Sequence, residues 1–159
     1  NNKVVHTIAR ACHELHQRSV RFNFRGVGKS TGSYGNGVGE IEDLRTVIQW
    51  VQKVRPNDEI WLAGFSFGGY IASALAHQPF VKQLITVAPA VKHFNFSALP
   101  TIYCPWLIIQ GDQDKIVDPH AVAALATKNP AHPKIAILPG AGHFFHGFLV
   151  DLKTILLKT

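Results

Sequence analysis

One pentapeptide constrains this chain more than any other feature, Gly64-Phe65-Ser66-Phe67-Gly68. It follows the apolar run from Glu59 to Ala63 and precedes an alanine-rich stretch with helical spacing, so the serine stands where a strand turns sharply into a helix. Such a turn strains the serine backbone and exposes its hydroxyl for attack. Glycines flank it because a Cβ at either position would collide with the neighbouring helix or strand. A bare GxSxG also occurs in ordinary glycine-rich loops, but the flanking patterns make that interpretation the weaker one.

A serine hydroxyl attacks well only when a base takes its proton, and the base needs a carboxylate to fix its tautomer. Both groups follow apolar, strand-like runs downstream of Ser66. Residues 105–110 lead into an acidic turn that contains Asp112 and Asp114, and residues 134–138 lead into a glycine-rich loop that ends at His143. The chain order of serine, acid and histidine is one that serine nucleophiles on such turns use.

Four segments follow one another in order: RFNFRGVGKSTG at 21–32, GFSFGGY at 64–70, GDQDKIVDP at 111–119 and GAGH at 140–143. Together they resemble the α/β-hydrolase superfamily, and more narrowly its small bacterial serine hydrolases that lack a cap. The resemblance covers nearly all 159 residues. It implies Ser66 as the nucleophile, Asp114 as the acid, His143 as the base, and the N–H of Phe67 as one donor of the oxyanion hole.

The resemblance implies hydrolysis of a carboxylic ester or thioester of a small molecule through an acyl-enzyme, with no cofactor and no metal. GFSFGGY also resembles the elbow of prolyl-oligopeptidase-type enzymes, so a serine peptidase is an alternative, although no propeller or acidic amine-anchoring pair is visible. A non-catalytic binding module with the same fold is a second alternative. The three ordered groups favour catalysis, because a protein freed from chemistry has no reason to keep them.

Neighbouring residues offer alternatives for the acid and the base. Asp112 is the alternative for the acid, with Asp114 then a cap of the loop, but we expect Asp114 to be the acid. His146 competes with His143, but we expect the chain to be entering its last helix at that point. Most of the nine histidines are expected to lie at the surface.

The segment Gly26-Val27-Gly28-Lys29-Ser30 invites a nucleotide-binding interpretation. A Walker phosphate loop, however, needs a glycine where the chain has Asn23, and a helix directly after the lysine. The dinucleotide pattern fails as well, because its third glycine falls at Thr31. We therefore expect a signature turn beside the active-site end of the sheet.

Helical and strand patterns alternate along the chain, which predicts an α/β fold with a mostly parallel sheet and helices on both faces. The patterns predict helices at 4–15, 38–51, 69–76, 121–128 and 148–157, and strands at 20–24, 59–63, 83–88, 105–110 and 134–138. No linker or repeat divides them, so residues 1–159 are predicted to form a single domain. Asp118 precedes Pro119, a pattern typical of an N-cap, so we expect no chemistry from Asp118.

The resemblance implies eight strands in the order 1-2-4-3-5-6-7-8, of which this chain supplies the last five. We therefore expect the first three strands, about 30–40 residues, to be missing by N-terminal truncation. The third strand would lie between residues 20–24 and 59–63, and the loop after it would supply the second oxyanion donor. A chain lacking them is expected to expose unpaired strand edges and to be weakly active.

The composition, with 47% hydrophobic and 16% charged residues, is that of a globular protein. The formal net charge is +6, but the sixteen Lys and Arg residues are scattered, and no nucleic-acid recognition motif is present. No apolar run approaches the roughly 18–20 residues of a membrane span. Cys12 and Cys104 are isolated and indicate buried thiols in a reducing cytoplasm. We expect a cytoplasmic protein with a small-molecule partner and no nucleic-acid or membrane partner.

Overall fold

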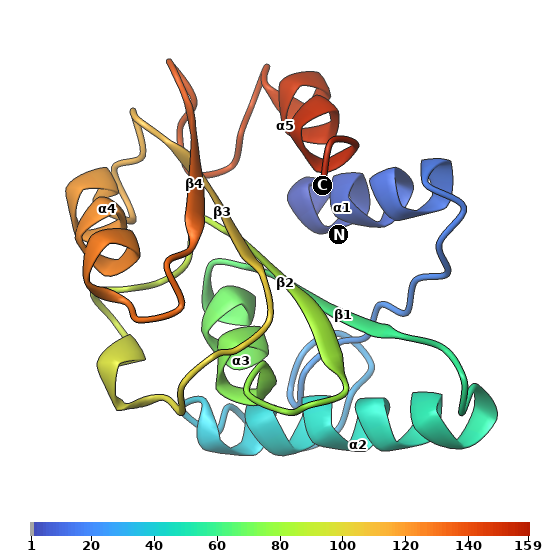
Figure 1. The fold of residues 1–159 in the computed structure, drawn as a ribbon. Helices are drawn as coiled ribbons and strands as arrows, with labels where there is room; N and C mark the ends of the chain where they lie inside the picture. The colour runs from blue at the N-terminus through green and yellow to red at the C-terminus, as the bar shows by residue number, and fades with distance from the viewer. Residues whose placement is uncertain (1) are drawn as a thin grey trace.

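A computed structural model describes residues 2–159, which form one parallel sheet with helices on both of its faces (Figure 1). The sheet has four strands in the order β1-β2-β3-β4, and each neighbouring pair is parallel. The strands are β1 (Ile60–Phe65), β2 (Val81–Val87), β3 (Trp106–Gly111) and β4 (Lys134–Leu138). The helices are α1 (Lys3–Glu14), α2 (Val38–Val54), α3 (Phe67–Leu75), α4 (Pro119–Lys128) and α5 (Leu149–Leu156), with a short 3₁₀ helix η1 (Phe96–Ala98). The predicted α/β class is confirmed.

Two apolar layers cover the sheet from opposite sides. One layer joins the sheet to α1 and α5, and the other joins it to α2, α3 and α4 (Figure 1). Neighbouring residues of a strand point to opposite faces, so Leu84 and Ile108 serve the second layer while Ile85 and Ile109 serve the first. All four are at most 4% exposed. Burial on both faces explains why these strands are almost continuously apolar in sequence.

The prediction of a strand at residues 20–24 is wrong. This segment carries no regular secondary structure, and residues 20–23 are exposed. Residues with high β-propensity do not form a strand by themselves, because a strand needs a neighbouring strand to satisfy its backbone hydrogen bonds. Phe22 and Phe24 instead pack edge to face, with ring centroids 5.2 Å apart. β1 is consequently an edge of the sheet in the described chain.

Local capping signals explain where the helices begin. The predicted N-cap at Asp118 is confirmed, because its carboxylate accepts a hydrogen bond from the His120 N–H at 3.0 Å and Pro119 is the first residue of α4. The Asn2 side chain accepts hydrogen bonds from two N–H groups in the first turn of α1. These caps set the helix ends locally, while the two apolar layers set where the helices lie on the sheet.

Candidate active site

Ser66 lies at the junction of β1 and α3, as the pentapeptide predicted. Its φ and ψ are 54° and −113°, a conformation that a residue with a side chain adopts only under strain. The backbone is held on both sides, since the Ser66 N–H donates to the Val87 carbonyl at 2.9 Å and the Ser66 carbonyl accepts from the Gly69 N–H at 3.0 Å. The Ser66 side chain makes no capping hydrogen bond to α3, so its hydroxyl is free for other partners.

The two glycines of the pentapeptide differ in the space around them. A Cβ at Gly64 would overlap the Gly68 carbonyl oxygen and come within 2.6 Å of the Gly69 nitrogen, so the steric prediction for Gly64 is confirmed. The same prediction for Gly68 is wrong, because no atom counted among residues 2–159 lies within 4 Å of a Cβ at that position. The Gly68 carbonyl group is what a Cβ at Gly64 would meet, so the steric requirement for glycine lies at position 64.

Three strand ends bring three reactive side chains to one edge of the sheet. Because β1, β3 and β4 belong to one parallel sheet, their carboxyl ends meet at the same edge, and Ser66, Asp114 and His143 each follow one of them. His143 Nε2 lies 3.1 Å from Ser66 Oγ, and His143 Nδ1 lies 2.8 Å from Asp114 Oδ2. With the hydrogen on Nδ1 facing the carboxylate, Nε2 is free to accept the serine proton. The structure therefore brings together the three side chains that the sequence singled out.

The two candidate acids have different surroundings. Asp114 is 6% exposed, and its Oδ1 accepts hydrogen bonds from two backbone N–H groups, at 2.9 and 2.8 Å. Asp112 is exposed, and its Oδ1 accepts from the Gly140 N–H at 2.7 Å. Of the two, it is Asp114 that contacts His143. Asp112 instead ties the turn after β3 to the loop after β4.

The loop that carries His143 is held at two further points. A Cβ at Gly111 would overlap the Ala141 carbonyl oxygen, so the turn after β3 and this loop run in direct backbone contact. Beyond His143, the Phe145 side chain is fully buried in the layer under α1 and α5. His146 is exposed in the loop before α5, against the Phe144 ring at 6.0 Å. Of the two histidines, it is His143 that hydrogen-bonds to Ser66.

Aromatic rings pack against His143 and against Phe67, the residue after the serine. The His143 ring lies next to Phe65 and Phe144, at centroid distances of 4.9 and 5.0 Å. The Phe67 ring, directly after the serine, contacts three further rings, those of Phe24 at 5.5 Å, Tyr34 at 5.7 Å and Phe94 at 5.1 Å. Phe144 is 45% exposed and Tyr34 is 60% exposed. Exposed aromatic surface therefore lies next to His143 and next to the residue that follows Ser66.

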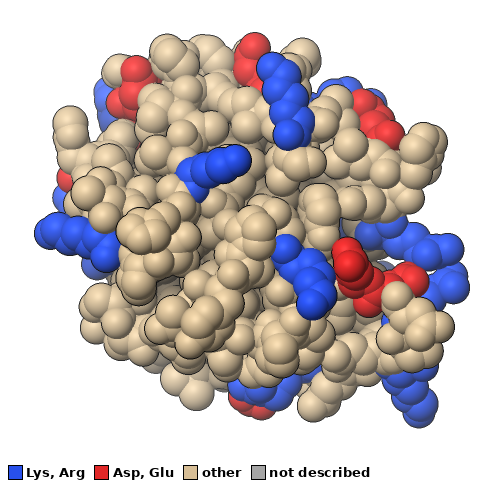
Figure 2. Space-filling model, in the orientation of Figure 1, with Lys and Arg blue, Asp and Glu red and all other residues tan. Residues whose placement is uncertain are grey.

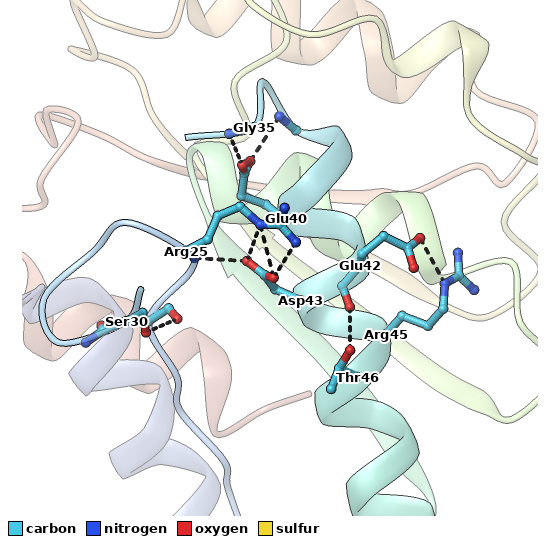
Figure 3. Close-up of polar contacts among 10 residues, drawn as sticks. Arg25, Ser30, Gly35, Glu40, Glu42, Asp43, Arg45 and Thr46 are labelled. Atoms are coloured by element: carbon cyan, nitrogen blue, oxygen red, sulfur yellow. Dashed lines mark hydrogen bonds and ion pairs between the residues drawn. The ribbon is translucent and has the colours of Figure 1, made fainter. Parts of the chain in front are cut away.

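Two carboxylates on α2 anchor the loop at residues 25–37 (Figure 3). Asp43 accepts hydrogen bonds from the Arg25 guanidinium, the shortest at 2.8 Å, and from the Arg25 backbone N–H at 2.9 Å. The guanidinium hydrogen bond holds the pKa of Asp43 below its usual value. Glu40, only 1% exposed, accepts from two backbone N–H groups of the loop at 2.6 and 3.1 Å. The loop that presents Tyr34 to Phe67 is thus fixed by polar contacts to α2.

Charged side chains are scattered over the face shown in Figure 2 and form no continuous basic patch there. Within residues 2–159, no three His, Cys, Asp or Glu side chains are grouped so that they could hold a metal ion. In the same part of the chain, every helix is too short or too polar to cross a membrane.

One residue that contacts the site was not predicted from the sequence. Gln110, at 0% exposure on β3, donates from Nε2 to Asp114 Oδ2 at 3.1 Å. The signal in the sequence is a single amide at the end of an otherwise apolar strand. A polar side chain in a buried strand has to find its partners inside the protein, so Gln110 was a candidate for contact with a buried polar group.

The fold and the conformation of Ser66 define a class of protein. It is the class of α/β proteins that carry a serine on a strained turn between a strand and a helix. The chain belongs to the α/β-hydrolase family, because a family model described as an alpha/beta hydrolase domain matches residues 1–149. An uncharacterised protein of Rickettsia prowazekii is 37% identical over 155 residues, which are 91% of this chain. The chain spans 65% of the length of that protein.

Solved structures give the same assignment. An alpha-beta serine hydrolase homologue from Coxiella burnetii is 50% identical, with a TM-score of 0.95 over 99% of this chain and 76% of that one. A serine hydrolase without a lid from Xanthomonas campestris is 45% identical, with a TM-score of 0.94 over 99% of this chain and 72% of that one. Est1E from Butyrivibrio proteoclasticus, with bound ferulic acid, is 19% identical at a TM-score of 0.88 over 99% and 82% of the two chains, a likeness of fold alone.

Proposed function

We propose that this protein hydrolyses carboxylic esters or thioesters of small molecules through an acyl-enzyme on Ser66. The observation that carries the proposal is the chain of two hydrogen bonds from Ser66 Oγ through His143 to Asp114, at 3.1 and 2.8 Å. These distances are within the reach that a nucleophile, a base and an orienting acid need. The strained backbone of Ser66, which exposes the hydroxyl, supports the same assignment.

In this proposal each proton moves between named atoms. Ser66 Oγ attacks the substrate carbonyl while His143 Nε2 takes the hydroxyl proton. The alcohol or thiol then leaves with that proton, and the acyl group stays on Ser66. A water molecule then attacks the acyl-enzyme and gives a proton to His143 Nε2. His143 passes this proton to Ser66 Oγ as the bond between Oγ and the acyl carbon breaks, and the carboxylic acid is released. Asp114 stays ionised throughout and stabilises the imidazolium through its bond to Nδ1.

The N–H of Phe67 is proposed as one donor to the oxyanion that forms during attack. Phe67 is the first residue of α3, so this N–H has no acceptor within the helix and points to the end where negative charge is favoured. The residue after the nucleophile supplies such a donor on turns of this type. One donor of this kind is worth about 10²–10³ in rate.

The rings around the site support a small substrate with an apolar group. Phe144 lies against His143, and Phe67 follows Ser66 and contacts Tyr34. These three rings are partly or largely exposed. The fold is known to hold a small carboxylic acid, since Est1E was solved with ferulic acid, although at 19% identity this likeness concerns the fold. A cytoplasmic location is part of the proposal, supported by the two unpaired thiols Cys12 and Cys104.

A peptidase and a non-catalytic binding module remain the two competing functions. No observation in the described residues favours the peptidase over the esterase. The binding module is disfavoured because a strained serine and a buried hydrogen-bonded acid are both costly to keep without a reaction to support.

The decisive experiment is labelling with a fluorophosphonate probe, followed by peptide mapping. We expect the label on Ser66, and we expect Ser66→Ala to lose labelling together with hydrolysis of p-nitrophenyl acetate, a loss of about 10⁶ in turnover in a related triad. Ser73→Ala, in the helix that follows Ser66, is the matched control, because the Ser73 hydroxyl is already bonded to the Gly69 carbonyl at 2.7 Å. Esterase activity that survives in Ser66→Ala would rule out the proposed mechanism.

A further inference from the structure

The side-chain amide of Gln110 has one orientation that its surroundings allow. Nε2 donates to Asp114 Oδ2 at 3.1 Å and to the Gly111 carbonyl at 3.2 Å. Turning the amide over would place its oxygen against these same two acceptors, which cannot donate to it. The NH₂ group of Gln110 is therefore directed at the carboxylate that holds His143.

With Gln110 included, all the acceptor positions of the Asp114 carboxylate are used. Oδ1 accepts from the backbone N–H groups of Ile116 and Val117, at 2.9 and 2.8 Å. Oδ2 accepts from His143 at 2.8 Å and from Gln110 at 3.1 Å. A carboxylate has about four such positions, so the Asp114 carboxylate cannot rotate about its Cβ–Cγ bond without breaking at least one hydrogen bond. Oδ2 thus has two side-chain donors, Gln110 and His143, while the donors to Oδ1 are backbone groups.

Gln110 carries a disadvantage that packing does not explain. Its Oε1 is buried and has no hydrogen-bond partner in the described residues. A buried acceptor without a partner destabilises the folded state, whereas an apolar side chain of the same shape would not. The hydrogen bonds that the Gln110 amide does make are therefore the two from Nε2, and one of them goes to Asp114.

We infer that Gln110 is a positioning residue that holds the Asp114 carboxylate in the orientation in which Oδ2 accepts from His143 Nδ1. This inference rests on the proposed function, since it concerns the rate at which His143 takes the Ser66 proton. Gln110 itself touches neither the substrate nor the reacting atoms. Its effect is expected in the chemical step and not in substrate binding.

The test is Gln110→Met, which keeps the length of the side chain and removes both polar atoms. We expect kcat for p-nitrophenyl acetate to fall about tenfold, the loss of one hydrogen bond to a charged acceptor, with KM unchanged. The thermal midpoint should change little, because the variant loses two hydrogen bonds but also removes the unpaired Oε1. In proton NMR, the downfield signal of the hydrogen on His143 Nδ1 should shift.

The matched control is Thr86→Val in the neighbouring strand. It removes the acceptor of the Trp106 Nε1–H, a buried bond of 3.0 Å that does not touch Ser66, His143 or Asp114. We expect the reverse pattern, a lower thermal midpoint with kcat unchanged. If Gln110→Met keeps its kcat and its NMR signal, or if its kcat falls only as far as that of Thr86→Val, Gln110 is a structural residue and the inference is overturned.

Failure of the proposed function gives a different result. In that case the unmutated protein neither takes the probe at Ser66 nor hydrolyses the ester, and the NMR signal alone decides the role of Gln110. A shifted signal in Gln110→Met then supports the positioning role in a protein with a different reaction, and an unchanged signal overturns it.

Discussion

Gly64 and Gly68 approach each other so closely that no side chain fits between them. A Cβ built on Gly64 overlaps the Gly68 carbonyl oxygen, across the turn that holds Ser66. The end of β1 and the first turn of α3 therefore pack backbone against backbone at this point. The turn can adopt this form only with glycine at position 64.

We expect Gly64→Ala to destabilise the fold by about 1–3 kcal/mol, the usual range for overpacking, and to lower hydrolysis by moving Ser66. Gly68→Ala is the control, because its Cβ meets open space in the described chain and alanine favours the helix over glycine. Thermal unfolding followed by circular dichroism measures both. Equal midpoints for the two variants would contradict the steric argument.

Asp114→Asn and Asp112→Asn should separate the two acids. We expect Asp114→Asn to fold normally and to lose about 10⁴ in turnover, because an amide facing Nδ1 favours the wrong imidazole tautomer. Asp112→Asn keeps an oxygen acceptor for the Gly140 N–H, so its turnover should change far less. Steady-state kinetics of both variants decides the point, and a reversed order of the two losses would make Asp112 the acid.

His143→Ala should lower turnover about 10⁶-fold if Ser66 and His143 act as in a related triad. His146→Ala should leave turnover nearly unchanged. The reason is that His143 contacts Ser66 whereas His146 is exposed against Phe144. Probe labelling of Ser66 should be lost in the first variant and kept in the second. A larger loss in His146→Ala would mean that the wrong histidine had been chosen.

The Arg25–Asp43 pair should make stability depend on pH in the acid range. The pKa of Asp43 is lowered in the folded state by the guanidinium, so this contribution is fully present above the unfolded pKa of about 3.9 and is lost as pH falls through the lower folded pKa. Asp43→Asn should therefore be less stable than the parent at neutral pH, and the gap should close below about pH 4. Urea unfolding at pH 7 and in steps below pH 4 measures this difference in stability. A difference that persists at the lowest pH would exclude the charge of Asp43 as its cause.

The two cysteines should react slowly in the folded protein. Burial raises the pKa of both the Cys12 and the Cys104 thiol, so little thiolate is present near neutral pH. We expect iodoacetamide at pH 7.5 to modify both much more slowly than in urea, as followed by mass spectrometry. Rapid modification of Cys104 in native conditions would show that the layer around it opens readily.

Patterns of local origin could be predicted from the sequence. The alternation of helical and strand signals places nine of the elements, and the N-cap at Asp118 follows from one aspartate before one proline. The turn at Ser66 is equally local, since the strand before it, the helix after it and the glycine at 64 are adjacent in the chain. Such features depend on residues within a few positions of one another, so the local sequence is enough to predict them.

Features that depend on distant neighbours were decided by the tertiary structure. Residues 20–24 have strand-like side chains, yet no strand lies beside them in the described chain to complete a ladder. Gly68 meets no obstacle, although its place in the motif matches that of Gly64. The sequence marks Gln110 as a lone amide in an apolar strand but does not name its partner, and the fold of the turn after β3 brings its NH₂ group to Asp114. A side chain acquires its partner from the packing of segments far apart in the chain, and that packing is not contained in any local pattern.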